Sequence, residues 1–194
     1  MKVLEPFIVV DEDEVEIVLY GLKIIASHIV TVFVVLITGL LLRSMDIAVI
    51  YLGVLFLLRR NVGGYHCKTY IGCLLTTNIT FMVIAVTNRW AIQGVKEILG
   101  IFLLLYSVIK IYNAEPIMNR NRIVSRDTIN RSNKRKVKWL SVLIIIAIIF
   151  HSLSRQAILN SYDYFYAISS TMMVIALSIK VKDIGGERYE EVNE

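Results

Sequence analysis

Long apolar runs, rather than apolar positions at regular helical or strand spacing, dominate this chain. A helix needs ~20 predominantly apolar residues to cross the hydrocarbon core of a bilayer, and several segments of the sequence reach or approach this length. The pattern therefore predicts an all-α integral membrane protein, folded as a single polytopic domain over residues 1–194 with about six transmembrane helices. The predicted spans are residues 22–42, 46–58, 70–87, 92–112, 139–158 and 164–179.

Polar and glycine-containing segments interrupt these runs. Residues 1–20 mix apolar and acidic positions, which is typical of a helix that lies in the membrane interface. The pair Gly63-Gly64 prevents a continuous helix, so residues 59–69 are predicted to be broken or re-entrant. Residues 113–138 are rich in Lys and Arg and are predicted to form a loop. Because the second span is short and the fifth contains polar side chains, four spans with two interfacial helices remain an alternative.

Composition agrees with a membrane protein and argues against an ordinary soluble domain. Of the 194 residues, 56% are hydrophobic and only 19% are charged, whereas about a quarter of the residues of a typical soluble domain are charged. The formal net charge of +5 is more typical of membrane orientation than of nucleic-acid binding. We therefore expect the lipid bilayer, and no nucleic acid, as a partner. The two cysteines, Cys67 and Cys73, lie too close together for a disulfide framework.

Basic residues are distributed unevenly between the two predicted sides of the membrane. With six spans, both termini and the even-numbered connections lie on one side, and the opposite side receives little beyond Arg43, Arg89 and Arg155. Lys and Arg accumulate in cytoplasmic loops, so the basic side, with both termini, is predicted to be cytoplasmic. The basic residues of that side are Arg59, Arg60, Lys68, Arg120, Arg122, Arg126, Arg131, Lys134, Arg135, Lys136, Lys138, Lys180 and Lys182.

One histidine and one cysteine form the best candidate for chemistry. His66 follows the double glycine, and Cys73 lies at the start of the third predicted span, where the helix dipole favours a thiolate. A cysteine nucleophile needs a base that accepts its proton and an acid that protonates the leaving amine. In one straight helix the two side chains would lie ~10 Å apart along the axis. The break at Gly63-Gly64 is therefore required for His66 to fold back onto Cys73.

Other roles for these residues are also open. A metal site built from His66, Cys67 and Cys73 lacks a fourth ligand and the spacing of structural zinc sites, so we expect no metal and no cofactor. His28 and His151 lie inside predicted spans, where a hydrogen bond within the helix bundle is the simpler explanation. Pattern alone places a catalytic Cys–His pair only slightly ahead of a structural role.

A longer motif makes the sequence recognisable. It runs from Leu58 to Thr69 as Leu-Arg-Arg-Asn-Val-Gly-Gly-Tyr-His-Cys-Lys-Thr and is followed by Cys73. Together with an N-terminal segment ending near Tyr20-Gly21 and a basic segment that begins Ala-Glu-Pro after the fourth span, this motif resembles the accessory gene regulator B (AgrB) family. The resemblance extends over nearly the whole chain.

The resemblance implies an enzyme of the cell membrane of a Gram-positive bacterium. Members of this family are membrane cysteine endopeptidases that process a short propeptide into a cyclic autoinducing peptide for quorum sensing. By this resemblance Cys73 is the nucleophile and His66 the base and then the acid, with Arg59, Gly63 and Gly64 in oxyanion or positioning roles. An acyl-enzyme thioester would form, and an internal thiol or hydroxyl of the propeptide would then close a thiolactone or lactone. Asn61 and Asn78 are candidates for orienting His66.

The resemblance also implies a partner with an amphipathic leader and an acidic tail. The basic segment could bind that tail, although orientation in the membrane and contact with lipid headgroups explain its charge as well. We further expect a homodimer, because short spans with polar groups favour self-association. A transporter or membrane scaffold, with His28, Asn78, Glu97 and His151 along a path, is the alternative function. The candidate tail-binding residues are Arg120, Arg122, Arg126, Arg131, Lys134, Arg135 and Lys136.

Overall fold

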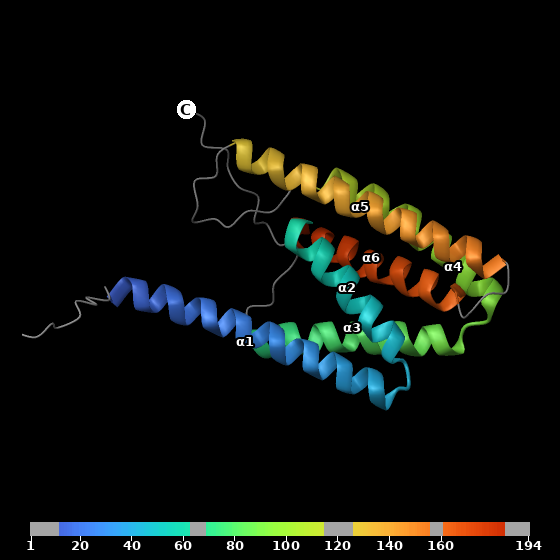
Figure 1. Ribbon diagram of the computed structural model, residues 1–194, viewed down its shortest axis with the longest axis horizontal. Coiled ribbons are helices and arrows are strands. Elements are labelled where there is room, and N and C mark those ends of the chain that lie inside the picture. The colour runs from blue at the N-terminus through green and yellow to red at the C-terminus, as the bar shows by residue number, and fades with distance from the viewer. Residues whose placement is uncertain (1–11, 63–68, 115–125, 156–160, 185–194) are drawn as a thin grey trace, which may run out of the picture.

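A computed structural model describes residues 12–62, 69–114, 126–155 and 161–184. These residues form six helices and no strand, which confirms the predicted all-α class. Figure 1 shows the helices aligned roughly along the long axis of the molecule. The helices are α1 (Glu12–Leu41), α2 (Met45–Val62), α3 (Tyr70–Trp90), α4 (Gln93–Asn113), α5 (Arg126–Arg155) and α6 (Ser161–Ile184).

The helices extend beyond the predicted spans, and α2 continues through residues 59–62, which were predicted to be broken. The two largest differences are in α1 and α5. α1 is one continuous helix from Glu12, so the described part of the acidic segment and the first apolar run are not separate elements. α5 begins at Arg126, so much of the predicted basic loop is helical. Both differences have the same physical cause. Hydropathy marks the part of a helix that suits a membrane, whereas Glu, Lys and Arg are good helix formers that extend it beyond that part.

Two helices among the described residues are long and apolar enough to cross a membrane. They are Ile71–Trp90 in α3 and Asn130–Ser154 in α5, and a shorter apolar stretch, Ile25–Leu41, lies in α1. The predicted number of six spans stays a prediction. Large apolar side chains are also exposed along α1 and α4, as expected of helix surfaces that face lipid. They include Ile25, Ile29, Phe33 and Ile37 of α1 and Ile98, Phe102, Leu105 and Ile109 of α4.

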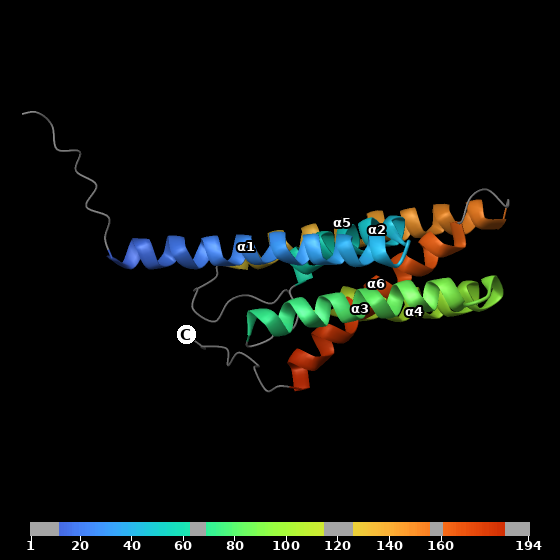
Figure 2. The same cartoon turned by 90° about the horizontal axis from the view of Figure 1, so that it is seen from below.

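α6 is the central helix of the bundle. It packs against α2, α3, α4 and α5, and its stretch from Phe165 to Met172 is buried throughout. Figure 2 shows α1, α2 and α5 in one layer, α3 and α4 in a second layer, and α6 crossing diagonally between them. α4 comes very close to α6 at Gly100, where a Cβ atom would lie 2.5 Å from the Phe165 ring. Small residues at such contacts allow helices of membrane proteins to approach closely.

A tight turn joins α1 to α2. The amide of Ser44 donates to the carbonyl of Gly39 (2.8 Å) and the amide of Arg43 donates to that of Leu40 (3.1 Å), which is the Schellman arrangement of a helix C-terminus. Glycine usually occupies the left-handed position, but here Arg43 does, with φ 52°. A Cβ atom on Gly39 would lie 2.7 Å from Cβ of Ala48, so the glycine permits the close return of the chain.

Candidate functional site

Cys73 lies in the first turn of α3. Thr69 caps this helix, and its hydroxyl accepts a hydrogen bond from the amide of Gly72 (3.2 Å). The amide of Cys73 donates to the carbonyl of Thr69 (3.2 Å). The Cys73 thiol is free and half-buried. The positive end of the helix dipole lies beside it, where negative charge that develops during a reaction is stabilised.

Arg59 reaches Cys73 from the last turn of α2. Its Nη2 donates to Cys73 Sγ over 3.5 Å, across fourteen positions of sequence. A guanidinium beside a thiol stabilises the thiolate, and it would equally stabilise negative charge on an oxygen that develops nearby. The structure therefore brings together two of the residues that the sequence singled out, Cys73 and Arg59.

A pocket of about 240 Å³ opens beside these two residues. α2, α3 and α6 line it, and among the residues that the structure describes Arg59 is the only charged one in its wall. The other described lining residues are Cys73, aliphatic residues and residues with a hydroxyl group. The lining residues are Tyr51, Leu55, Arg59, Cys73, Thr76, Thr77, Thr80, Val174, Ile175, Leu177 and Ser178.

Sequence reasoning missed Tyr51 and the threonines of α3. Tyr51 is fully buried, and its hydroxyl donates to the carbonyl of Thr77 (2.9 Å) and lies 2.7 Å from Oγ1 of Thr80. A signal existed in the spacing. Tyr51 and Arg59 share one face of α2, and Cys73, Thr77 and Thr80 share one face of α3. The α6 part of the wall has no comparable signal, because only tertiary packing brings it there.

Several predicted site residues lie outside the described residues. These include the proposed base and both glycines, so the predicted contact between His66 and Cys73 stays a prediction. Cys67 belongs to the same stretch. Among the described residues, no group of three or more His, Cys, Asp or Glu side chains could hold a metal ion. The predicted residues outside the described part of the chain are Gly63, Gly64, His66, Arg120 and Arg122.

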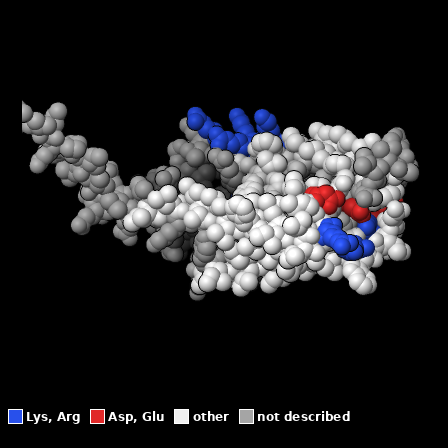
Figure 3. All heavy atoms as spheres, turned by 60° about the horizontal axis from the view of Figure 1, so that its bottom comes forward, with Lys and Arg blue, Asp and Glu red and all other residues white. Residues whose placement is uncertain are grey.

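The basic half of α5 lies at the same end of the bundle as Cys73. Ser132 Oγ donates to the carbonyl of Asn61 (3.4 Å), in the last turn of α2 that also carries Arg59. Figure 3 shows Lys and Arg side chains gathered at one edge, separated by uncharged surface from a group of mixed charge. Arg126 begins α5, but its side chain is not described. The exposed basic residues of this half are Arg131, Lys134, Arg135 and Lys138, which we call the α5 basic face.

Lys136 differs from its neighbours on α5. Only 3% of the residue is exposed, and its ammonium group donates to the carbonyls of Tyr112 (3.0 Å) and Ala114 at the end of α4. Cations stabilise the C-terminal carbonyls of a helix in this way. Lys136 thus differs from the other predicted tail-binding residues in that its side chain joins α5 to the end of α4, and its role in tail binding stays a prediction.

Of the four polar residues of the alternative transport path, two lie close together, Glu97 and His151. His28 is exposed on α1 and makes an edge contact with Phe56. Nε2 of His151 lies 3.7 Å from Oε1 of Glu97. Asn78 does not line the pocket beside Cys73, nor does it line a second pocket at the other end of α3, which is described next. Asn61, one candidate for orienting His66, donates its amide to the carbonyl of Leu57 in its own helix (2.8 Å).

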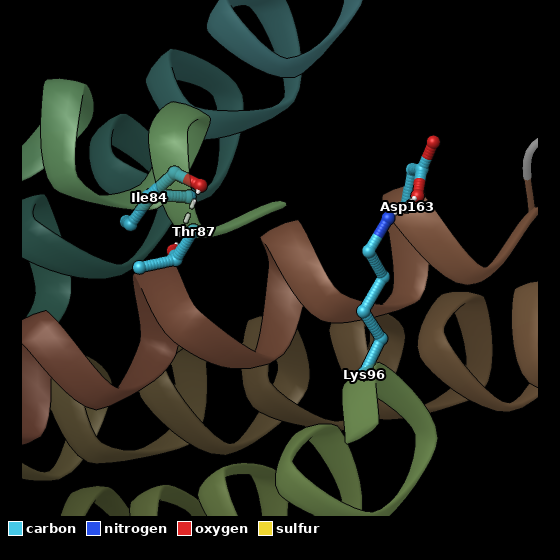
Figure 4. Close-up of polar contacts among 4 residues, drawn as sticks. All are labelled: Ile84, Thr87, Lys96 and Asp163. Carbon is cyan, nitrogen blue, oxygen red and sulfur yellow. Dashed lines mark hydrogen bonds and ion pairs between the residues drawn. The ribbon is translucent and has the colours of Figure 1, made fainter. Parts of the chain in front are cut away.

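A second pocket, of about 220 Å³, lies at the other end of α3. Charged residues of both signs are concentrated there. Behind it, Nζ of Lys96 contacts Oδ1 of Asp163 at 2.5 Å, as Figure 4 shows, and Lys96 is 7% exposed. Figure 4 also shows Thr87 of α3, whose hydroxyl donates to the carbonyl of Ile84 (3.1 Å). The lining residues are Arg43, Ser44, Asp46, Ile47, Ala85, Asn88, Arg89 and Asp163.

Comparison with known proteins agrees with the motif at the first pocket. The family model of accessory gene regulator B matches residues 7–179. A protein of Clostridium perfringens (strain 13 / Type A) that is described as AgrB-like is 27% identical over 125 residues, which are 62% of this chain and 64% of that protein. The match thus spans less than two thirds of the relative's length. No solved structure matches the chain. Because the family match covers most of the 194 residues, the chain belongs to the accessory gene regulator B family.

Proposed function

We propose that this protein is a membrane-embedded cysteine endopeptidase that removes the C-terminal tail of a short propeptide and enables its cyclisation into a quorum-sensing signal. One observation carries the proposal. The Cys73 thiol lies in the first turn of a helix, 3.5 Å from the Arg59 guanidinium, at the wall of an apolar pocket. Family membership supports a role in propeptide processing.

The proposed reaction has two acyl transfers. His66 accepts the proton of the Cys73 thiol, and the thiolate attacks the carbonyl carbon of the peptide bond before the tail. The bond to the tail nitrogen breaks, His66 gives its proton to that nitrogen, and the tail leaves with a new amino terminus. The acyl group remains on Cys73 as a thioester. His66, now neutral, accepts the proton of a thiol or hydroxyl within the propeptide, and that sulfur or oxygen attacks the thioester carbon. The bond from this carbon to the Cys73 sulfur breaks, the peptide leaves as a thiolactone or lactone, and the proton passes from His66 to the Cys73 thiolate.

Arg59 and the helix end provide the electrostatic part of this proposal. Each tetrahedral intermediate carries negative charge on oxygen, and fixed cationic donors at such a position lower the barrier. The guanidinium is already held at the sulfur by its place in α2. His66 lies three residues before Thr69 in the sequence, and three residues span at most ~11 Å. The imidazole is therefore within reach of the first turn of α3, and Gly63 and Gly64 would permit the approach.

Exclusion of water favours cyclisation over hydrolysis. Forming a thioester from an amide is energetically uphill, and water competes with the internal nucleophile for the thioester carbon. The aliphatic side chains Leu55, Val174 and Leu177 line the pocket beside Cys73. An apolar enclosure that limits access of water would leave the nearby thiol or hydroxyl of the propeptide as the main acceptor.

The α5 basic face supports binding of an acidic tail on the cytoplasmic side. Arg131, Lys134 and Arg135 are exposed and lie at the end of the bundle that carries Cys73. A cluster of one sign attracts a segment of the opposite sign and raises its local concentration. An amphipathic leader on the inner leaflet would bring the propeptide to the same membrane surface. Association of two copies into a homodimer stays a prediction.

Coexpression with the short peptide encoded beside the gene tests this proposal. The unaltered protein should release the tail and produce a peptide with the mass of the cyclised product, as measured by mass spectrometry of cells and medium. Replacing Cys73 with Ala should abolish tail release at an unchanged protein level, because the proposed reaction proceeds through a thioester on the Cys73 sulfur. Cys67→Ser serves as the matched control and should retain activity. Tail release by Cys73→Ala at the original rate would rule out the mechanism.

A further inference from the structure

We propose that the pocket beside Cys73 is the subsite for the acyl residue of the propeptide, the residue just before the cleaved bond, and that it selects an uncharged apolar side chain there. This inference rests on the proposed function. It adds a substrate specificity and an orientation of the bound propeptide, neither of which follows from a cysteine nucleophile alone.

Geometry connects the pocket to the acyl residue. Cys73 is part of the pocket wall, so an acyl carbon attached to its sulfur lies at the pocket surface. The Cα atom of the acyl residue is bonded directly to that carbon. Its side chain therefore has to occupy the space next to Cys73, and the described cavity there has a volume of about 240 Å³. Val174, Ile175 and Leu177 of α6 contribute the apolar part of its wall.

The hydroxyl groups of the wall do not change this apolar character. The hydroxyl of Thr77 donates to the carbonyl of Cys73 (2.9 Å), that of Thr76 to Gly72 (2.8 Å), and that of Ser178 to Ile175 (2.7 Å). Tyr51 and Thr80 likewise use their hydroxyl hydrogens within the protein. These donors are already satisfied by backbone carbonyls. A bound side chain therefore meets methyl groups and occupied hydroxyls, and recognition depends on shape and desolvation.

Charge fixes the direction of the peptide. A carboxylate in this pocket would lose its water among aliphatic side chains and satisfied hydroxyls, and it would have to compete with Cys73 for the Arg59 guanidinium. Acidic residues therefore belong on the leaving side of the cleaved bond, toward the α5 basic face, and not in the pocket. Within the described part of the wall Arg59 is the only charged residue, and it contacts the Cys73 sulfur. The propeptide would thus bind with its acyl residue between α2, α3 and α6 and its tail toward α5.

Changing the size of a pocket side chain and of the acyl residue together tests the inference. Propeptides with Ala, Leu, Phe, Trp or Asp as the acyl residue are coexpressed with the unaltered protein, with Val174→Ala and with Val174→Trp, and tail release is measured by mass spectrometry. Asp should be cleaved at least about tenfold more slowly than the best apolar residue. Val174→Ala should shift the preference toward Trp, and Val174→Trp should shift it toward Ala. Met173→Ala, which changes a half-buried α6 residue outside the pocket, should leave the ranking unchanged.

The outcomes separate this inference from the proposed function. If tail release requires Cys73 but the ranking of acyl residues is identical in all variants, the subsite assignment is wrong and the endopeptidase proposal stands. If tail release does not require Cys73, both are wrong. A changed ranking of acyl residues in only the two Val174 variants supports the subsite, because a general loss of folding would lower tail release from every propeptide by a similar factor.

A second measurement needs no propeptide and applies if the Trp variant folds poorly. Purified Cys67→Ser protein, which keeps Cys73 as its single thiol, is treated with N-phenylmaleimide or with a negatively charged methanethiosulfonate. The rate of each reagent with Cys73 is divided by its rate with a small free thiol. This normalised rate should be about tenfold higher for the apolar reagent than for the charged one. Leu177→Ala should change the ratio of the two normalised rates, whereas Met173→Ala should not. A ratio that depends only on the amount of added phospholipid would identify a lipid chain as the occupant and overturn the inference.

Discussion

The two ends of α3 enclose pockets of similar volume and opposite character. At the Cys73 end, Arg59 is the single charged residue, and no carboxylate occurs, among the described residues that line the cavity of about 240 Å³. At the other end, the cavity of about 220 Å³ is lined by residues of both signs, including Arg89 and Asp163. The two pockets therefore have similar volumes but very different electrostatic environments.

The difference concerns how each end uses its charges. At the polar end Asp163 pairs with Lys96 at 2.5 Å. Arg89 donates a hydrogen bond to the carbonyl of Leu42 (3.2 Å), which lies in the α1–α2 turn. These contacts join α1, α3, α4 and α6 and stabilise the fold. At the Cys73 end the guanidinium contacts a thiol, whose neutral form gains little from a cation. The electrostatic benefit there appears only when sulfur or a nearby oxygen becomes negative, as catalysis requires.

Removing one guanidinium from each end is the strongest test of this comparison. Arg59→Gln should lower the rate of tail release by about a hundredfold, which is typical for loss of one donor to a developing oxyanion. Arg59→Lys should recover part of the rate, because the charge remains. Arg89→Gln removes the same group from the polar end of the molecule and should stay within about twofold of the unaltered rate, after correction for protein level.

The readout for this pair has to exclude a folding effect. The rate of Cys73 alkylation by iodoacetamide at neutral pH, measured on purified Cys67→Ser protein, should fall with Arg59→Gln and not with Arg89→Gln. Equal effects of the two substitutions on both tail release and alkylation would remove the distinction between the ends.

A smaller effect is expected from the α5 basic face. Exchanging Arg131, Lys134 and Arg135 for Glu should reduce tail release by roughly three- to tenfold at low salt, since exposed charge pairs each contribute little and are screened. The reduction should shrink as salt is raised, whereas that of Arg59→Gln should persist. Arg89→Glu is the control at the polar end. The orientation of the variant in the membrane must be checked, because these residues also favour a cytoplasmic location. A reduction that is independent of salt would contradict tail binding by this face.

Sequence alone named two residues that meet at the Cys73 end, but it did not predict the shape of the pocket there. Cys73 and Arg59 belong to one short motif, so both could be named before the structure. Tyr51 had only the weaker signal of sharing a face of α2 with Arg59, and Val174 had none, because α6 reaches this pocket only through packing between helices that are distant in sequence. Helix type followed from the apolar runs, but α5 extends through residues whose charge suggested a loop. Lys136 has the same charge as its exposed neighbours, and only its position on the buried side of α5 reveals its structural role.

Trapping the acyl-enzyme tests the central claim most directly. Purified protein is mixed with the propeptide, quenched in acid at short times, and examined by intact-protein and peptide mass spectrometry. The account predicts an added mass equal to the propeptide without its tail, located on the peptide that contains Cys73 and removed by hydroxylamine. An adduct on Cys67, or full release of the tail by Cys73→Ala protein without any adduct, would contradict it.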